Sequence, residues 1–158
     1  MSLLAFFQWC YDTSIGDTIR NSTWLFPVIE AFHLLGFGLT AGSVLIVELR
    51  LLGFGLSREP VEKLAASSQP WLIGGVTLMF ASGIPLFMSE SIKAYYSFAF
   101  WVKMACLFLV LLYTFTLRRR VTRTELSSTR PALARSLAIL SIALWFGVAW
   151  GGRWIGFS

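Results

Sequence analysis

The stretch Trp24–Val47, WLFPVIEAFHLLGFGLTAGSVLIV, decides the fold class because it is almost entirely apolar. Only Glu30 and His33 interrupt it with ionisable side chains. The hydrocarbon core of a bilayer is about 30 Å thick, and about 20 helical residues cross it. Lipid offers the backbone no hydrogen-bond partners, so a crossing segment must be helical. The stretch therefore predicts a transmembrane helix over about 24–47.

Three later stretches repeat this pattern, at about 71–88, 98–117 and 136–150. The first and the last carry no charge, and the middle one carries only Lys103. The chain has 158 residues, of which 56% are hydrophobic and 13% charged, and its mean hydropathy is +0.71. A soluble domain carries about 25% charged residues. We therefore expect an all-α protein, an integral membrane four-helix bundle, with one domain over residues 1–158.

The segments outside these four stretches predict short connections. Residues 2–11 are apolar but too few to span, so we expect a short interfacial helix, followed by a polar linker over 12–22. We also expect a short outer loop over 89–97. Pro85 predicts a kink in the second long helix, because proline removes a helix hydrogen bond.

The distribution of basic residues predicts the orientation. Arginine and lysine gather in the connections that follow the first and third long helices, while few lie on the other side. By the positive-inside rule the basic connections face the cytoplasm, so both termini are expected in the periplasm of a bacterial inner membrane. The basic residues of the inner side are Arg50, Arg58, Lys63, Arg118, Arg119, Arg120, Arg123, Arg130 and Arg135; those of the outer side are Arg20, Lys93 and Arg153.

The net charge of +5 fits this topology signal and contact with anionic lipid headgroups, and we expect no nucleic-acid partner. The expected partners are the lipid bilayer and either further copies of the chain or a larger membrane complex. Gly38 and Gly42 form a GxxxG pattern, which permits close packing of helices within or between chains. Gly74, Gly75 and Gly83 of the second long helix are expected to face it.

Ionisable groups inside apolar helices are costly, so Glu30, His33 and Lys103 are candidate functional residues. Glu30 and His33 are three residues apart and share one helix face. His33 lies about 14 Å from the outer end of its helix, and Lys103 enters from the same side to a depth near Glu30. Pairing of Glu30 with Lys103 would lower the cost of burying either charge.

Two interpretations of these residues remain open. In the first, they form a structural network that holds the first and third long helices in register. In the second, His33 binds a metal as an axial ligand of haem, and Lys103 or Met104 supplies the other ligand. Glycines beside His33, such as Gly36, would give the macrocycle room. The chain contains one histidine, so two histidine ligands would require two chains.

The remaining polar residues predict no classical catalytic site. Glu48 and Arg50 end the first long helix, and we interpret them as a boundary motif, in which Arg50 can reach the inner headgroups and Glu48 can pair with an arginine of a nearby loop. Cys10 and Cys106 are expected at different depths, and Cys106 is interpreted as a small packing residue. The sequence contains no paired carboxylates and no phosphate-binding loop. If the protein is an enzyme, the pattern favours a haem-linked oxidoreductase.

Several of these residues carry a resemblance to known families. The runs Phe26–Gly36, Glu48–Gly53 and Phe100–Met104 resemble an uncharacterised family of small bacterial four-helix membrane proteins. More distantly, the pattern resembles the four-helix haem-b protoporphyrinogen oxidases and the membrane domain of copper-resistance protein D. The oxidase resemblance implies that His33 and Lys103 hold haem b. The spacing from His33 to Gly42 and Arg50 departs from the oxidase pattern.

Three functions are therefore carried forward as hypotheses. The first is a small b-type cytochrome-like membrane protein that binds haem in the outer half of the bundle for electron transfer or haem-linked redox work. The second is a non-catalytic accessory or scaffold subunit that packs through its glycine faces. The third is a small ion or proton channel or transporter lined by Glu30, His33 and Lys103.

Overall fold

The computed structural model describes residues 2–55, 59–123 and 130–156, and within these ranges it contains helices and no strand. Four helices are long and apolar enough to cross a membrane. They are α3 (Leu25–Leu52), α4 (Val61–Tyr96), α5 (Phe98–Leu112) with its π-helical continuation η1 (Tyr113–Leu117), and α8 (Pro131–Ile155). The predicted all-α class is confirmed, and the four candidate spans indicate a multi-pass membrane protein. Arg58 of the basic connections lies outside the described residues.

The N-terminal segment forms two helices, α1 (Leu3–Tyr11) and α2 (Ser14–Asn21). Helix α1 agrees with the expected short helix, but the prediction of a linker over 12–22 is wrong. The Thr13 side chain caps α2 by accepting a hydrogen bond from the Gly16 N–H, and Asp17 lies in the first turn. An N-cap threonine followed by an acidic first turn is a helix-start signal. This segment was predicted as a linker because its composition is polar.

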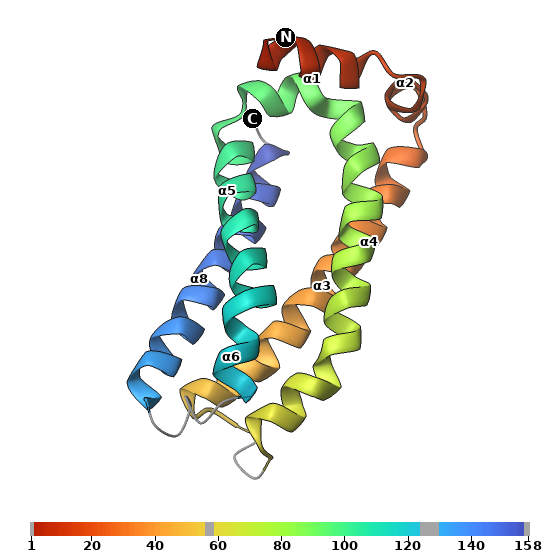
Figure 1. Ribbon diagram of the computed structural model, residues 1–158. Helices are drawn as coiled ribbons and strands as arrows, with labels where there is room; N and C mark the ends of the chain where they lie inside the picture. The colour runs from red at the N-terminus through yellow and green to blue at the C-terminus, as the bar shows by residue number, and fades with distance from the viewer. Residues whose placement is uncertain (1, 56–58, 124–129, 157–158) are drawn as a thin grey trace.

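Helix α4 is twice as long as the apolar stretch within it. It includes Pro70 and Pro85 and runs on to Tyr96, so the predicted outer loop over 89–97 is almost entirely helical. The expected kink is present, but the non-helical dihedral angles fall at Glu90 (φ −125°, ψ 22°) rather than next to Pro85. Beyond Glu90 the last turns of α4 run sideways beneath α1 toward the start of α5 (Figure 1).

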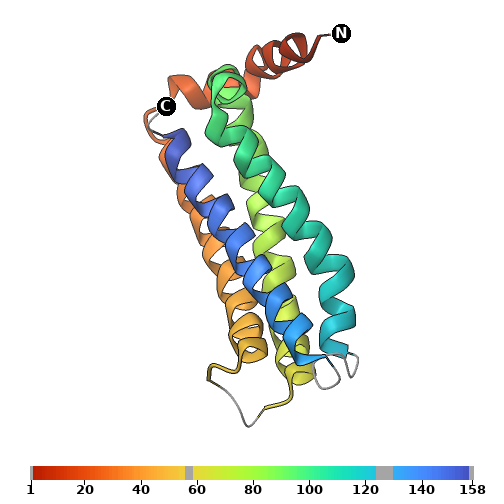
Figure 2. The ribbon, with the colours of Figure 1, turned by 90° about the vertical axis from the view of Figure 1, so that its left-hand side faces the viewer.

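The four long helices form two pairs. Helix α3 packs along α4, and α5 packs along α8, while α3 also contacts α8. Helices α4 and α5 are consecutive in the chain, yet they contact each other little. The N- and C-termini lie at one end, here called the termini end; the opposite end, where α3 ends and α8 begins, is called the basic end (Figures 1 and 2).

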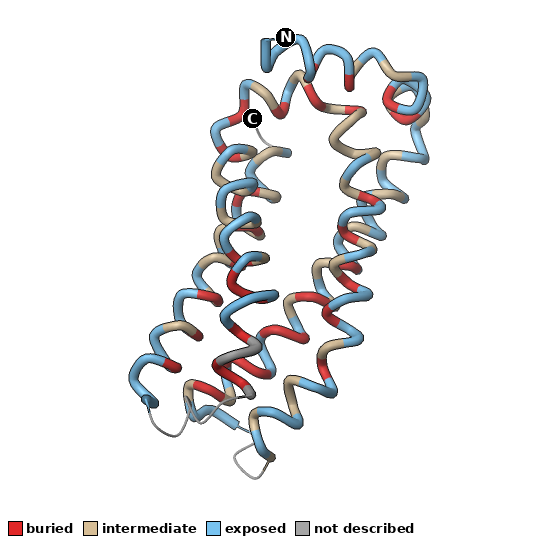
Figure 3. The backbone as a smooth tube through the Cα atoms, in the orientation of Figure 1, coloured by how far each residue is buried: buried red, intermediate tan, exposed pale blue. Residues whose placement is uncertain are grey.

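The buried core lies mainly toward the basic end. One apolar cluster combines Val44 of α3 with Val110 of α5 and Trp145 of α8, and a second combines Val47, Leu51 and Val121 with residues of α8. No residue of α3 before Gly36 is buried, as Figure 3 shows in the part of α3 near the termini end. The two pairs are therefore held together chiefly in the half near the basic end.

An aromatic cluster covers the termini end. The ring of Phe7 on α1 contacts Phe87, Tyr95, Phe100 and Trp101, with ring centroids 5.2 to 6.1 Å apart. The hydroxyl of Ser91 donates to the Phe7 carbonyl at 2.9 Å. These contacts fix α1 across the end of α4 and the start of α5.

Candidate functional site

His33 lies on the face of α3 that packs against α4, and it is half-buried. Its Nδ1 is 3.1 Å from the carbonyl oxygen of Met79 and 3.0 Å from the hydroxyl oxygen of Ser82. The Ser82 hydroxyl donates its own hydrogen to the Leu78 carbonyl at 2.6 Å. Both neighbours of Nδ1 are therefore acceptors, so the hydrogen of the neutral ring is on Nδ1.

This tautomer leaves Nε2 of His33 with an available lone pair. A metal-binding histidine usually donates its other N–H to a carbonyl or carboxylate, which fixes the ring orientation. The carbonyl of Met79 accepts the hydrogen bond from His33 Nδ1 and so fixes the ring. One nitrogen of the ring is therefore engaged by α4, and the other is left for a further partner.

Gly83 of α4 allows the His33 ring to lie against the helix backbone. A Cβ at position 83 would come within 3.0 Å of His33 Cε1 and 3.4 Å of Nδ1. Any larger residue there would push the ring away from its hydrogen-bond acceptors. Gly83 is a residue that the sequence placed in a packing role and that the structure places beside the candidate ligand.

Gly36 has a different environment from the one that the haem interpretation assigned to it. It is buried, and a Cβ there would lie 3.0 Å from the Gly75 oxygen and 3.0 Å from the Met79 nitrogen. The space beside Gly36 is filled by the backbone of α4. Gly36, Thr40 and Gly75 form the close seam between α3 and α4, where the Thr40 hydroxyl donates to the Gly36 carbonyl at 2.8 Å.

The GxxxG pattern does not form that seam. A Cβ at Gly38 or at Gly42 would meet no atom within 4 Å, and the same holds for Gly74. The expectation that Gly38 and Gly42 pack on α4 is therefore wrong within this chain. The residues of α3 that form the seam, Gly36 and Thr40, are also four positions apart. They lie two positions before Gly38 and Gly42, and a threonine takes the place of the second glycine.

Lys103 of α5 is half-buried and lies against α8. A Cβ at Gly151 would come within 2.9 Å of the Lys103 Cβ, and one at Gly152 would lie 3.6 Å from its Nζ. The two glycines thus make room for the lysine stem. Lys103 and His33 belong to different helix pairs, because α5 packs along α8 and α3 packs along α4.

Glu30 is exposed, and in the described part of the chain no ion pair joins it to Lys103. Three residues of an α-helix correspond to a rotation of about 300°, so Glu30 projects about 60° from His33. Met104 follows Lys103 and is exposed. The structure packs His33 against α4 and Lys103 against α8, and it leaves Glu30 and Met104 exposed.

A second polar site lies near the basic end, and of it the sequence predicted only that Glu48 can pair with an arginine. Glu48, interpreted from the sequence as a boundary residue, is completely buried, and its Oε1 is 3.9 Å from Nε of the buried Arg118. Tyr113 is within electrostatic range of both groups, and Ser141 of α8 lies beside the carboxylate. We call Glu48, Tyr113, Arg118 and Ser141 the inner polar cluster.

The π-helix η1 shapes this cluster. The Arg118 N–H donates to the Tyr113 carbonyl, a bond to the fifth preceding residue, which stacks Arg118 one wide turn below Tyr113. Arg118 Nη2 also donates to the Ser43 carbonyl at 3.4 Å, which joins η1 and α6 (Arg118–Arg123) to α3. Single π-turns of this kind occur frequently at functional sites.

Most polar atoms of the inner polar cluster have no direct hydrogen-bond partner. Within the described part of the chain, five buried groups make no hydrogen bond: both carboxylate oxygens of Glu48, the Tyr113 hydroxyl, Nε of Arg118 and the Ser141 hydroxyl. Buried polar groups normally bond to protein or to ordered water. The cluster contains donors around one carboxylate, which is a composition that bridging water can satisfy.

A binding site for a metal ion held by protein ligands alone is not formed by the described residues. Among them, no group of three or more histidine, cysteine, aspartate or glutamate side chains comes together. Cys10 and Cys106 are free, and the Cys106 sulfur lies opposite Gly147 in the seam between α5 and α8. His33 is therefore not joined by further side chains of these types in the described part of the chain.

These features define a class: an all-α, multi-pass membrane protein with ionisable side chains at two depths of its long helices. The chain belongs to the Family of unknown function (DUF6644), whose model matches residues 6–158. No curated protein and no solved structure matches it. The predicted membership of an uncharacterised family is confirmed, and the resemblance to haem-b proteins stays a prediction.

Proposed function

We propose that this protein is a small b-type cytochrome-like protein that holds haem b between His33 and Lys103. The observation that carries the proposal is the fixed tautomer of His33, whose Nδ1 donates to the Met79 carbonyl at 3.1 Å and whose Nε2 keeps its lone pair. A half-buried histidine that uses one nitrogen in this way is prepared to bind iron with the other.

Lys103 would hold the group from the other helix pair through its amine. Gly151 and Gly152 leave its stem a path along α8. The bound haem would supply one-electron chemistry by changing between its ferric and ferrous states.

The proposed topology is a four-helix bundle with both termini in the periplasm of a bacterial inner membrane. The basic residues that follow α3 and η1 support it through the positive-inside rule. His33 would then lie in the periplasmic half of the bilayer, where an electron partner in the membrane or in the periplasm can approach.

The test is the absorption spectrum of protein purified in mild detergent after expression with ample haem. The wild type should show a Soret band, and His33→Ala should abolish it. Phe32→Ala is the matched control, because Phe32 precedes His33 and is 52% exposed. Colourless wild-type protein, or an unchanged spectrum for His33→Ala, would remove the proposal.

The identity of the second ligand needs its own pair of variants. Lys103→Leu should shift the Soret and α bands toward those of five-coordinate haem, whereas Met104→Leu should leave them unchanged. The reverse result would assign the second position to Met104, which is 41% exposed on α5. A spectrum that neither substitution alters would exclude both side chains as ligands.

A second candidate function, that of a non-catalytic subunit, is favoured by one observation. Gly38 and Gly42 lie one turn apart on α3 with no atom within 4 Å of their built Cβ positions, so a helix of another chain can approach closely there. Gly38→Leu/Gly42→Leu should then abolish an assembly measured by light scattering in detergent, and Gly74→Leu should preserve it. A wild-type monomer without co-purifying partners would count against this function.

A further inference from the structure

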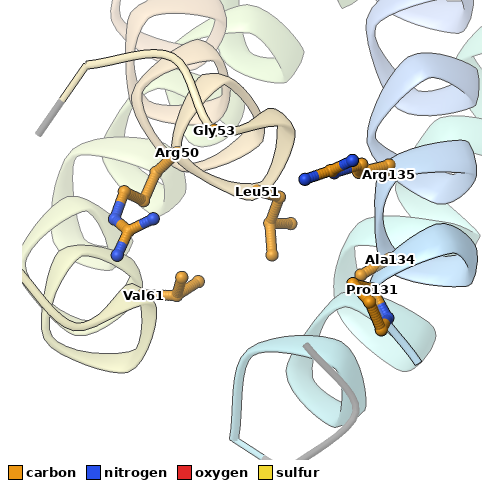
Figure 4. Close-up of a pocket in the computed structure, with 7 residues that line it drawn as sticks. All are labelled: Arg50, Leu51, Gly53, Val61, Pro131, Ala134 and Arg135. Atoms are coloured by element: carbon orange, nitrogen blue, oxygen red, sulfur yellow. The ribbon is translucent and has the colours of Figure 1, made fainter. Parts of the chain in front are cut away.

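A pocket opens at the basic end where three helices begin or end. It has a volume of about 250 Å³ and lies between the end of α3, the start of α4 and the first turns of α8. Figure 4 shows Arg50 and Arg135 at its two sides, with Leu51 between them and Val61 below Arg50. The pocket is separate from the candidate haem site, which lies in the other half of the molecule.

Two arginines from different helices give this pocket a positive charge. Arg50 comes from the last turn of α3 and Arg135 from the second turn of α8, and none of the described residues that line the space is acidic. Arg50 is held in place by donation from its Nε to the Glu59 carbonyl at 3.0 Å. The Glu59 carboxylate is paired with Lys63 at 2.9 Å, so it does not neutralise the pocket.

The start of α8 adds to this potential. Pro131 occupies the first helical turn, and the N-cap residue Arg130 makes no side-chain capping bond. The positive end of the helix dipole therefore faces the pocket, and it favours a nearby anion. Arg135 lies one turn farther along the same helix.

The base of the pocket is apolar. Leu51 and Ala134 belong to a buried cluster with Val47, and Val61 packs against it. A pocket with guanidinium groups at its rim and aliphatic side chains at its base matches a phospholipid, which joins a phosphate to acyl chains. Because α3 ends at Leu52 and α8 begins at Pro131, the pocket lies at the level where headgroups meet the hydrocarbon.

We propose that this pocket binds the phosphate group of an anionic phospholipid, with Arg50 and Arg135 as its two charged contacts. Guanidinium groups bind phosphate through charge-assisted hydrogen bonds, and basic pockets between helices are typical sites for anionic headgroups. The proposal does not depend on haem, and it would survive a colourless protein.

Native mass spectrometry of the full chain in detergent, titrated with phosphatidylglycerol or phosphatidylcholine, tests the proposal. Phosphatidylglycerol should bind more tightly, and Arg50→Gln/Arg135→Gln should weaken its binding by about tenfold or more. Arg135→Gln alone should give an intermediate loss, which guards against misfolding caused by the change at Arg50. Lys93→Gln, an equal loss of charge at the exposed far end of α4, is the matched control.

Inorganic phosphate alone forms the second arm of the experiment. Weak phosphate binding together with tight phosphatidylglycerol binding supports a lipid site. Phosphate binding as tight as lipid binding, lost in the double variant, would overturn the lipid assignment in favour of a soluble anion. Equal lipid binding by the wild type and the double variant would overturn the site itself.

Discussion

The two polar sites of α3 differ in what surrounds them. His33 and Glu48 are separated by fifteen residues, or about 22 Å of helix. Around His33 the helix pairs leave polar side chains half-buried, and the ring has hydrogen-bond partners on one side only. Around Glu48 both helix pairs are in contact, and residues such as Val47 and Val110 are completely buried. The surroundings of His33 are thus the more open of the two, and the residues around Glu48 join the two helix pairs.

The largest expected effect comes from breaking the inner polar cluster. Glu48→Leu leaves Arg118 buried without its carboxylate, which should cost about 3–5 kcal/mol of unfolding free energy. Glu48→Leu/Arg118→Met should recover most of that loss, because removing both charges also removes their desolvation cost. Unfolding by SDS in mixed micelles measures both variants. A single variant as stable as the wild type would show that the cluster does not join the helix pairs.

The seam between α3 and α4 should give the next largest effect. A Cβ at position 75 would lie 2.5 Å from the Thr40 hydroxyl oxygen and 2.8 Å from the Gly36 oxygen, so Gly75→Ala should destabilise by about 1–3 kcal/mol. Gly74→Ala is the adjacent control, with nothing within 4 Å. Equal stability of the two variants in thermal unfolding would mean that the helices separate without cost.

Gly83→Ala should affect the site near the termini end more than the fold. The added methyl would contact His33 Cε1 at 3.0 Å and displace the ring, at a cost of about 1 kcal/mol or more in stability. If haem is bound, the Soret band should weaken as well. A spectrum identical to that of the wild type would mean that the His33 ring does not bind the haem.

The smallest effect is expected for Ser82→Ala. The substitution removes one of two acceptors of the His33 Nδ1–H, while the Met79 carbonyl remains, so the loss should be about 1 kcal/mol or less. The fluorescence-detected melting temperature in detergent measures it. A loss as large as that of Glu48→Leu would contradict the difference between the two sites.

The sequence predicted what composition determines. Four apolar stretches became four long helices because lipid permits no other backbone for them. The prediction for α2 failed because a capping threonine, Thr13, acts locally within a polar stretch and leaves no hydrophobic period. Helix α4 is longer than predicted because it does not begin after Pro70. The residues on both sides of this proline are helical.

The candidate site could be predicted only in part. His33 and Lys103 were identified because charge in an apolar helix is conspicuous. Gly83 and the acceptors Met79 and Ser82 depend on how α4 lies against α3, which one sequence does not contain. Glu48 was assigned to the boundary because its partner Arg118 belongs to a distant run of arginines, and only the fold brings the two together.

The contact between Arg118 and α3 also bears on the order of synthesis. The hydrogen bond from Arg118 to the Ser43 carbonyl joins residues 75 positions apart, so α3 is synthesised well before its charged partner. During that interval the Glu48 side chain must be accommodated by the insertion machinery or by water. Arrival of Arg118 then gives Glu48 its partner, and α8, which is made last, completes the inner polar cluster with Ser141.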